Sequence, residues 1–313
     1  MSPHPATGAE PRDRTAPSAQ TVRVAAHQPG YHRHLYYFYK MAVSDVFVSL
    51  DTVQFAAREW QNRQVFVRGG ERRWLSVPVN RGREPIRDKR IADHGVLRDH
   101  WATLSSLYRS TPYFARYAPR LEEIYSTEWT LLRDLCDALT GVVREALDIT
   151  TPYLRAGDLI PHPSHTRGAL LAELARSAAV YAQRLPQRGE RPCGERPYET
   201  PPGGEGAGGV PGGTPGVEYL ACATPMREDH YLMRASAQHP ALTERQVMER
   251  HGVTVGTFPY RHPVYPQRQF PPGHPFEAEL SAFDLLFNHG PRSRGMLLGA
   301  AAPAPPETDG DPK

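Results

Sequence analysis

The sequence lacks a long apolar run, a set of paired cysteines and a dense block of like charge. No stretch of its 313 residues comes near the roughly 18 consecutive apolar residues that indicate a membrane-spanning helix. Its 3 cysteines, Cys136, Cys193 and Cys222, are odd in number and widely spaced, which argues against a disulfide framework or a zinc site and favours a reducing cytoplasm. The net charge of +3 is small and arginine outnumbers lysine without forming a basic stripe, so nucleic-acid binding is not indicated, although a tRNA donor stays open.

Three segments are too rich in proline, glycine and charge to bury a core. Residues 1–20 form a lead-in without the apolar segment of a signal peptide, residues 299–313 form a similar tail, and residues 184–216 form an insertion. All three are expected to be disordered. One folded domain is then expected over residues 21–298.

Polar side chains follow two expected strands near the N-terminus, at the point where each strand ends. The hydrophobic pattern indicates a strand, a buried helix and a second strand over residues 22–26, 35–41 and 45–50. His27 and Gln28 follow the first strand, and Asp51 and Gln54 follow the second. Because parallel strands end on one edge of a sheet, and ligands of open α/β sheets bind at that edge, these four side chains are expected to share it.

The rest of the chain alternates between the two kinds of periodicity. A hairpin turning at Gly69 and Gly70 comes next. The remaining expected elements are helices over 96–108, 112–124, 129–147, 167–181 and 281–287 and strands over 217–223 and 253–260. Thr127 is the expected N-cap of the helix over 129–147, and Ser281 is the expected N-cap of the helix over 281–287. The predicted fold is α/β, with a mainly parallel or mixed sheet, flanking helices and a helical middle segment.

Several motifs in this order make the chain resemble the WbqC-like protein family. They are HQP, SDVFVSLD, VQF, WQNR, WLSVPV, IRDKRIAD, WATLSSLYRSTPYF, YRHPVYPQ and LSAFDLLFNHG, and they span most of residues 21–298. The resemblance implies a place in bacterial surface-polysaccharide or natural-product biosynthesis and the transfer of a small acyl or aminoacyl group. The family has a small glycine-rich turn after the strand at 217–223, whereas this chain has Thr224 and Pro225 there, which puts a close backbone approach at that point in doubt.

Two residues are the candidates for catalysis. His27 is suited to general acid–base work because its ordinary pKa lies near neutrality; the alternative is a histidine bonded to backbone at a strand end. Asp51 ends a buried strand, where a carboxylate needs a partner, and Arg63 or Lys40 has the right charge to supply one. A structural ion pair is the alternative to a catalytic carboxylate.

Further polar residues are candidates for binding a substrate. Arginine and amide side chains suit a carboxylate, a phosphate or a sugar hydroxyl. The candidates are Gln28, Lys40, Gln54, Asn62, Arg63, Tyr260, His262, Asp284 and Asn288. His32 and His34 are two residues apart and diverge on a helix, so no metal site is expected. Cys222 could carry an acyl group, but a small buried strand residue is the better interpretation.

The residues leave more than one function open. The first hypothesis is a transferase that moves a small acyl or aminoacyl group onto an amine of a sugar or metabolite. The second is a nucleotidylyltransferase-like enzyme, although the chain has no P-loop, and no GxGxxG motif stands between an expected strand and an expected helix. The third is a non-catalytic ligand-binding protein of a biosynthetic cluster. A small-molecule substrate and no membrane partner are expected, while the cofactor and the oligomeric state are not indicated.

Overall fold

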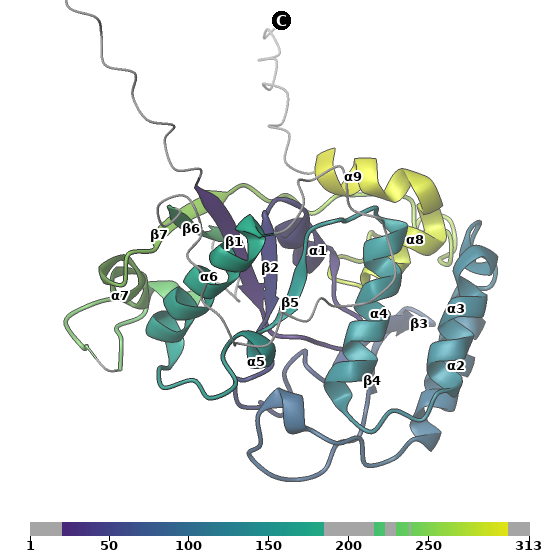
Figure 1. Ribbon diagram of the computed structural model, residues 1–313. Helices are drawn as coiled ribbons and strands as arrows, with labels where there is room; N and C mark the ends of the chain where they lie inside the picture. The colour runs from purple at the N-terminus through teal and green to yellow at the C-terminus, as the bar shows by residue number, and fades with distance from the viewer. Residues whose placement is uncertain (1–20, 185–215, 223–229, 238, 300–313) are drawn as a thin grey trace, which may run out of the picture.

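The computed structural model describes residues 21–184, 216–222, 230–237 and 239–299, and it has the α/β architecture predicted from the sequence (Figure 1). Residues 1–20 and 300–313 of the two expected tails, residues 185–215 of the expected insertion and the Thr224–Pro225 turn lie outside the described residues. Gly299, expected to begin the C-terminal tail, ends the last helix instead. The strands are β1 (Val22–His27), β2 (Val46–Ser49), β3 (Arg63–Arg68), β4 (Glu71–Ser76), β5 (Tyr153–Arg155), β6 (Val217–Cys222) and β7 (Thr254–Phe258). The α-helices are α1 (Leu35–Ala42), α2 (Gly95–Tyr108), α3 (Phe114–Ser126), α4 (Leu132–Ala146), α5 (Ala156–Leu159), α6 (Arg167–Gln183), α7 (Glu244–Arg250), α8 (Ala282–His289) and α9 (Ser293–Gly299).

The central sheet has five strands in the order β5-β2-β1-β6-β7, and every pairing in it is parallel. β1 is the middle strand. From β1 the chain moves outward to β2 and β5, and it later returns to the other side of β1 to form β6 and β7. The strand order therefore reverses between β1 and β6, and open α/β sheets bind ligands outside the carboxyl ends of the strands at such a reversal.

Side chains of the sheet alternate between two apolar layers. Val24 and Val48 belong to a core that includes residues of α6 and α7, and α6 crosses the sheet on the near side in Figure 1. Ala25 and Phe47 belong to the core of the opposite face, which includes residues of α1, α4 and α8. The carboxyl ends of β1 and β2 thus lie between two helical layers.

The hairpin of β3 and β4 forms a separate two-stranded antiparallel sheet, with Gly69 and Gly70 at positive φ in its turn. The glycines suit this turn because they have no Cβ atom to clash at positive φ. The helical middle segment, α2 to α4, follows the hairpin, as the sequence predicted.

The start of α4 differs from the expected one. Thr127 does not cap α4; it ends α3, where its hydroxyl donates to the Glu123 carbonyl at 2.8 Å. The chain before α4 is drawn toward another segment, because the Leu132 amide donates to the Lys89 carbonyl at 2.8 Å. Residues 129–131 therefore cannot form the first turn of the helix. Among the described residues, no helix combines the length and the apolar character needed to cross a membrane.

Candidate functional site

The carboxyl edge of the sheet carries a row of three buried polar side chains. His27, Ser49 and Arg155 occupy neighbouring register positions on β1, β2 and β5. Register partners in parallel strands point to the same face, so all three face the layer that contains α1 and α4. Their exposed fractions are 8%, 1% and 5%, respectively. The Ser49 hydroxyl is therefore a buried polar group in the middle of the row, beside the Tyr153 hydroxyl.

The His27 ring is held in one tautomer by the backbone. Its Nδ1 donates to the Gln28 carbonyl at 2.9 Å, since a carbonyl oxygen can only accept. The neutral ring then carries its lone pair on Nε2. The Tyr37 ring packs against the imidazole in an edge-to-face contact with centroids 5.3 Å apart. His27 therefore combines an oriented ring with a nitrogen able to accept a proton.

Asp51 lies just beyond β2, with 1% of its surface exposed. Its carboxylate pairs with Arg133 Nη1 at 2.7 Å and accepts the Gly157 amide at 2.8 Å. The sequence predicted Arg63 or Lys40 as the counterion, and that prediction is wrong. The Lys40 ammonium lies 5.4 Å from the Tyr219 ring, and α4 supplies the arginine that Asp51 contacts.

A network of charged groups on α4 continues from this pair along the edge. Arg155 Nη2 lies 2.8 Å from Asp134 and 2.7 Å from Asp137, and the Tyr153 hydroxyl donates to Asp137 at 2.8 Å. Tyr37 joins through a contact of 3.2 Å between its hydroxyl and that of Tyr153. Burial raises the pKa of Asp137 to about 6, and the Arg155 charge limits the rise. Contacts thus run from the ring beside His27 to the helix that holds Asp51.

The loop between β2 and β3 is tied to the same edge through Gln61. The Gln61 amide donates to Gln28 Oε1 at 2.7 Å, and its own oxygen accepts the Ala56 amide at 2.9 Å. The Gln61 carbonyl accepts the Tyr31 amide at 3.0 Å. Gln28 therefore serves in part to anchor this loop over the strand ends.

The other binding candidates from the hairpin region have partners of their own. Asn62 donates to the Val77 carbonyl at 2.8 Å, and its Oδ1 has no partner among the described residues. The Arg63 guanidinium stacks on Trp74 at 4.1 Å and donates to the Arg58 carbonyl. Gln54 is exposed. Asn62 and Arg63 contact the hairpin and the segments directly flanking it, whereas Gln54 forms an isolated bridge with Pro85. None of these contacts reaches His27 or Asp51.

Tyr260 and His262 follow β7 and contact each other, with the Tyr260 hydroxyl 3.1 Å from His262 Nδ1. Tyr260 also packs edge-to-face against Tyr36 of α1 at 5.3 Å. Burial, followed by the effect of nearby His34, lowers the pKa of His262 to about 4. Both residues therefore lie beyond the carboxyl end of the strand at the other side of the sheet.

Asp284 and Asn288 of α8 organise a loop instead of the sheet edge. The fully buried Asp284 carboxylate accepts hydrogen bonds from Tyr108, Tyr265, Gln267 and Gln269. Burial raises its pKa despite these donors. Asn288 Oδ1 accepts the Arg268 amide at 2.7 Å. This pattern is that of a buried anchor for residues 265–269.

His32 and His34, the pair weighed as metal ligands, have separate surroundings. His32 contacts the Tyr125 hydroxyl, and its Nδ1 lies 3.2 Å from the Ser281 hydroxyl, while His34 packs against Trp60. Within the described ranges, no group of three or more His, Cys, Asp or Glu side chains is placed to hold a metal ion. The side chain of Cys222 lies outside the described residues.

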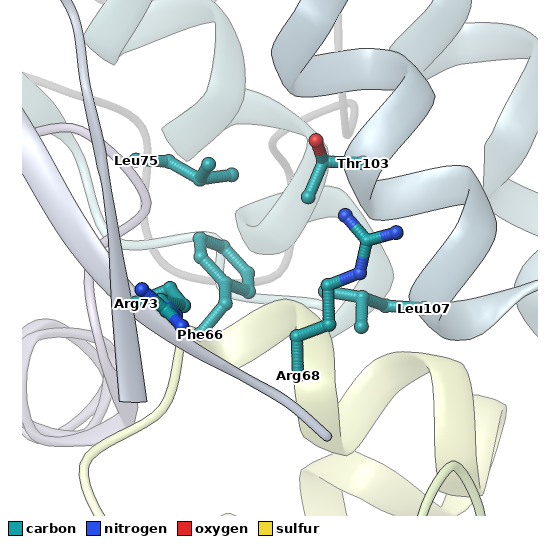
Figure 2. Close-up of a pocket in the computed structure, with 6 residues that line it drawn as sticks. All are labelled: Phe66, Arg68, Arg73, Leu75, Thr103 and Leu107. Carbon is teal, nitrogen blue, oxygen red and sulfur yellow. The ribbon is translucent and has the colours of Figure 1, made fainter. Parts of the chain in front are cut away.

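A separate hollow of about 420 Å³ lies between the hairpin and α2 (Figure 2). Apolar side chains from both elements form part of it, and two arginines come from the hairpin. The lining residues are Phe66, Arg68, Arg73, Leu75, Thr103 and Leu107. Arg73 is paired with Glu71. None of the candidate residues predicted from the sequence lines this hollow.

Three arginines at the carboxyl edge were not among the candidates from the sequence: Arg33, Arg133 and Arg155. Arg33 stands between the two histidines that were considered for a metal. Arg133 and Arg155 gain their positions from α4 and β5. A usable signal was the polar Asp137 directly beside Cys136 on the apolar side of α4, since a buried carboxylate there requires a cation from elsewhere.

Comparison with known proteins gives one family and one distant relative. The model of the WbqC-like protein family matches residues 28–199 and 218–295. A protein of Mycobacterium tuberculosis (strain ATCC 25618 / H37Rv), "Uncharacterized protein Rv1507c", is 32% identical over 140 residues. That match covers 44% of this chain and 61% of the relative, so the chain spans less than two thirds of the protein it matches. No solved structure matches the chain significantly.

Proposed function

The chain belongs to the WbqC-like protein family, and from that premise we propose that it is a transferase which moves a small acyl or aminoacyl group onto an amine of a sugar or metabolite. The observation that carries the proposal is the position of His27. Its oriented imidazole ends the middle strand, next to the reversal of strand order where open α/β sheets bind ligands.

The proposed reaction uses His27 Nε2 as a general base. The acceptor amine attacks the acyl carbonyl carbon, a new C–N bond forms, and the bond from the acyl group to its leaving group breaks. His27 takes the proton from the amine and returns it to the leaving group. The roles of the neighbours follow from their contacts: Asp51 positions Arg133 and the Gly157 amide, and Ser49 offers a buried hydroxyl in the same row.

The test compares His27→Ala with the wild-type protein. Purified protein is incubated with acyl or aminoacyl donors and amino-sugar or amine acceptors, products are followed by mass spectrometry, and affinity is followed by calorimetry. We expect turnover to fall about 100-fold or more with nearly unchanged affinity, because general acid–base catalysis contributes about 10²- to 10⁴-fold.

His94→Ala is the matched control, because His94 is an exposed histidine just before α2. It should leave turnover unchanged. Binding by the wild-type protein without any product would indicate a ligand-binding protein instead, and nucleotide-dependent release of pyrophosphate would indicate nucleotidyl transfer.

A further inference from the structure

We infer that Arg33 forms an anion-binding site beside His27, which takes one anionic oxygen of a carboxylate or phosphate on the donor or acceptor. That the rest of the ligand is an acyl donor or an amine acceptor rests on the proposed function. The site itself follows from the burial, the contacts and the charge of Arg33.

Among the residues that the structure describes, Arg33 is a buried cation without a carboxylate partner. Only 4% of its surface is exposed, and no carboxylate of the described residues lies within 4.0 Å of its guanidinium. Arg155 is buried to the same degree and has two carboxylates within 3 Å. A buried charge with no counterion destabilises the folded state, and a bound anion would offset that cost.

The guanidinium is also fixed in place by the turn that follows β1. Arg33 Nη2 donates to the carbonyls of Gln28 at 2.6 Å and Pro29 at 3.2 Å. Its Nε lies against Gly30, where a Cβ atom would come within 2.4 Å of it, and has no partner in the described part of the chain. Nη1 is therefore the nitrogen left for a ligand, which limits the contact to a single oxygen.

This nitrogen belongs to the same small region as the proposed base. The Gln28 carbonyl accepts from both His27 Nδ1 and Arg33 Nη2. Tyr37 contacts both groups as well, with the His27 ring at 5.3 Å and the Arg33 guanidinium carbon at 5.5 Å from its centroid. One small molecule can thus place an anionic oxygen on Arg33 and a reacting amine near His27.

Thermal unfolding of the full chain in different anions tests the site without any assay of turnover. Wild-type protein is compared in sodium chloride, sodium phosphate and sodium acetate at equal ionic strength. An anion that binds the folded state alone raises the unfolding midpoint as its concentration increases. We expect phosphate or acetate to raise the midpoint above that in chloride, and the anion that does so identifies the phosphate or carboxylate source.

The Arg33→Gln variant should need an anion concentration about tenfold higher or more to reach the same rise in the unfolding midpoint. The glutamine amide can still donate to a carbonyl of the turn but carries no charge. Arg68→Gln is the control, since Arg68 is an exposed arginine of the separate hollow, and it should keep the wild-type response.

Two results would overturn the inference: a wild-type midpoint that is the same in all three salts, or an Arg33→Gln variant with the full wild-type response. Should Arg33→Gln fail to fold, Arg33→Lys is measured in its place. Lysine keeps the charge but loses the planar fork, so a weaker response supports the site and an unchanged response contradicts it. A wild-type anion response combined with no transferase activity would leave the site standing and remove only the proposed function.

Discussion

Asp51 shows how the environment of one residue decides what its ion pair contributes. The carboxylate is almost fully buried, and both the Arg133 guanidinium and the Gly157 amide depend on it. Removing Asp51 would leave the Gly157 amide without its acceptor and the largely buried Arg133 with only its 3.6 Å contact to Asp134. The pair of Arg245 and Glu249 in α7 has a similar distance of 3.0 Å, but its side chains are 41% and 43% exposed.

Asp51→Ala is therefore expected to lower the free energy of unfolding by about 3–5 kcal/mol, the usual cost of breaking a buried pair. Urea unfolding at neutral pH measures this. Glu249→Ala is the exposed counterpart and should cost less than about 1 kcal/mol because water screens the pair. Equal costs for the two variants would contradict the role assigned to burial.

The candidate site could be predicted from the sequence only where a polar residue directly follows a strand. His27, Gln28 and Asp51 could be placed at the edge in this way, because strand ends are visible in the hydrophobic pattern. The partner of Asp51 could not, since Arg133 is 82 residues away and reaches it only after α4 packs on the sheet. In a chain rich in arginine, nothing local distinguishes Arg133, Arg155 or Arg33 from the exposed arginines.

At the scale of elements, segments with a clear apolar pattern were predictable and the shortest strand was not. Helices α2, α4 and α6 and the strands β1, β2, β6 and β7 lie where apolar periodicity indicated them. β5 has three residues, too few to show alternation, and it exists because it pairs with β2. Helix α4 starts later than predicted because the Leu132 amide donates to the Lys89 carbonyl. This contact joins segments far apart in the sequence, so local helix propensity could not predict it.

The turn between β1 and α1 depends on the absence of a side chain at Gly30. A Cβ atom there would lie 2.4 Å from Arg33 Nε and 2.5 Å from the Trp60 carbonyl oxygen. The second contact is with backbone, which cannot rotate away. The close approach of the loop to the strand end therefore requires glycine.

Gly30→Ala should lower the free energy of unfolding by about 1–3 kcal/mol, the usual cost of overpacking a filled site. Gly295→Ala in α9 is the matched control, because a Cβ atom there meets nothing within 4 Å. Alanine favours a helix over glycine by about 1 kcal/mol, so the control should be neutral or stabilising. Chemical denaturation of both variants measures the difference, and a neutral Gly30→Ala would show that the loop can move aside.

At the scale of the whole molecule, buried histidines make the fold sensitive to acid. Burial lowers the pKa of His32 to about 3 and that of His100 to about 4. Both lie in one buried network, in which the Tyr31 hydroxyl contacts His100 Nδ1 at 2.8 Å and the Tyr125 hydroxyl at 3.0 Å. The unfolded chain takes up these protons near pH 6.5, whereas the folded chain does not.

His100→Asn is expected to reduce this sensitivity. The contribution of neutral His100 to stability is present above about pH 6.5 and is lost as the pH falls toward about 4. Asparagine can still contact Tyr31 but does not titrate. Urea unfolding between pH 7 and pH 4 should show that the wild-type free energy of unfolding decreases relative to the variant by up to about 1.4 kcal/mol per pH unit. Parallel curves for the two proteins would exclude His100 as a source of the effect.

The position of β1 in the middle of the sheet also has a consequence for the order of events during synthesis. β1 leaves the ribosome first and can pair with β2 at once, but its other neighbour, β6, begins only at Val217. At about 5–20 residues per second, that edge stays unpaired for on the order of 10 s or longer. An open edge on a buried strand invites pairing with other chains. During this interval we expect the nascent chain to be prone to aggregation through the open edge of β1. A chain truncated before Val217 should therefore aggregate, because the strand that carries His27 would expose an edge to which other chains can pair.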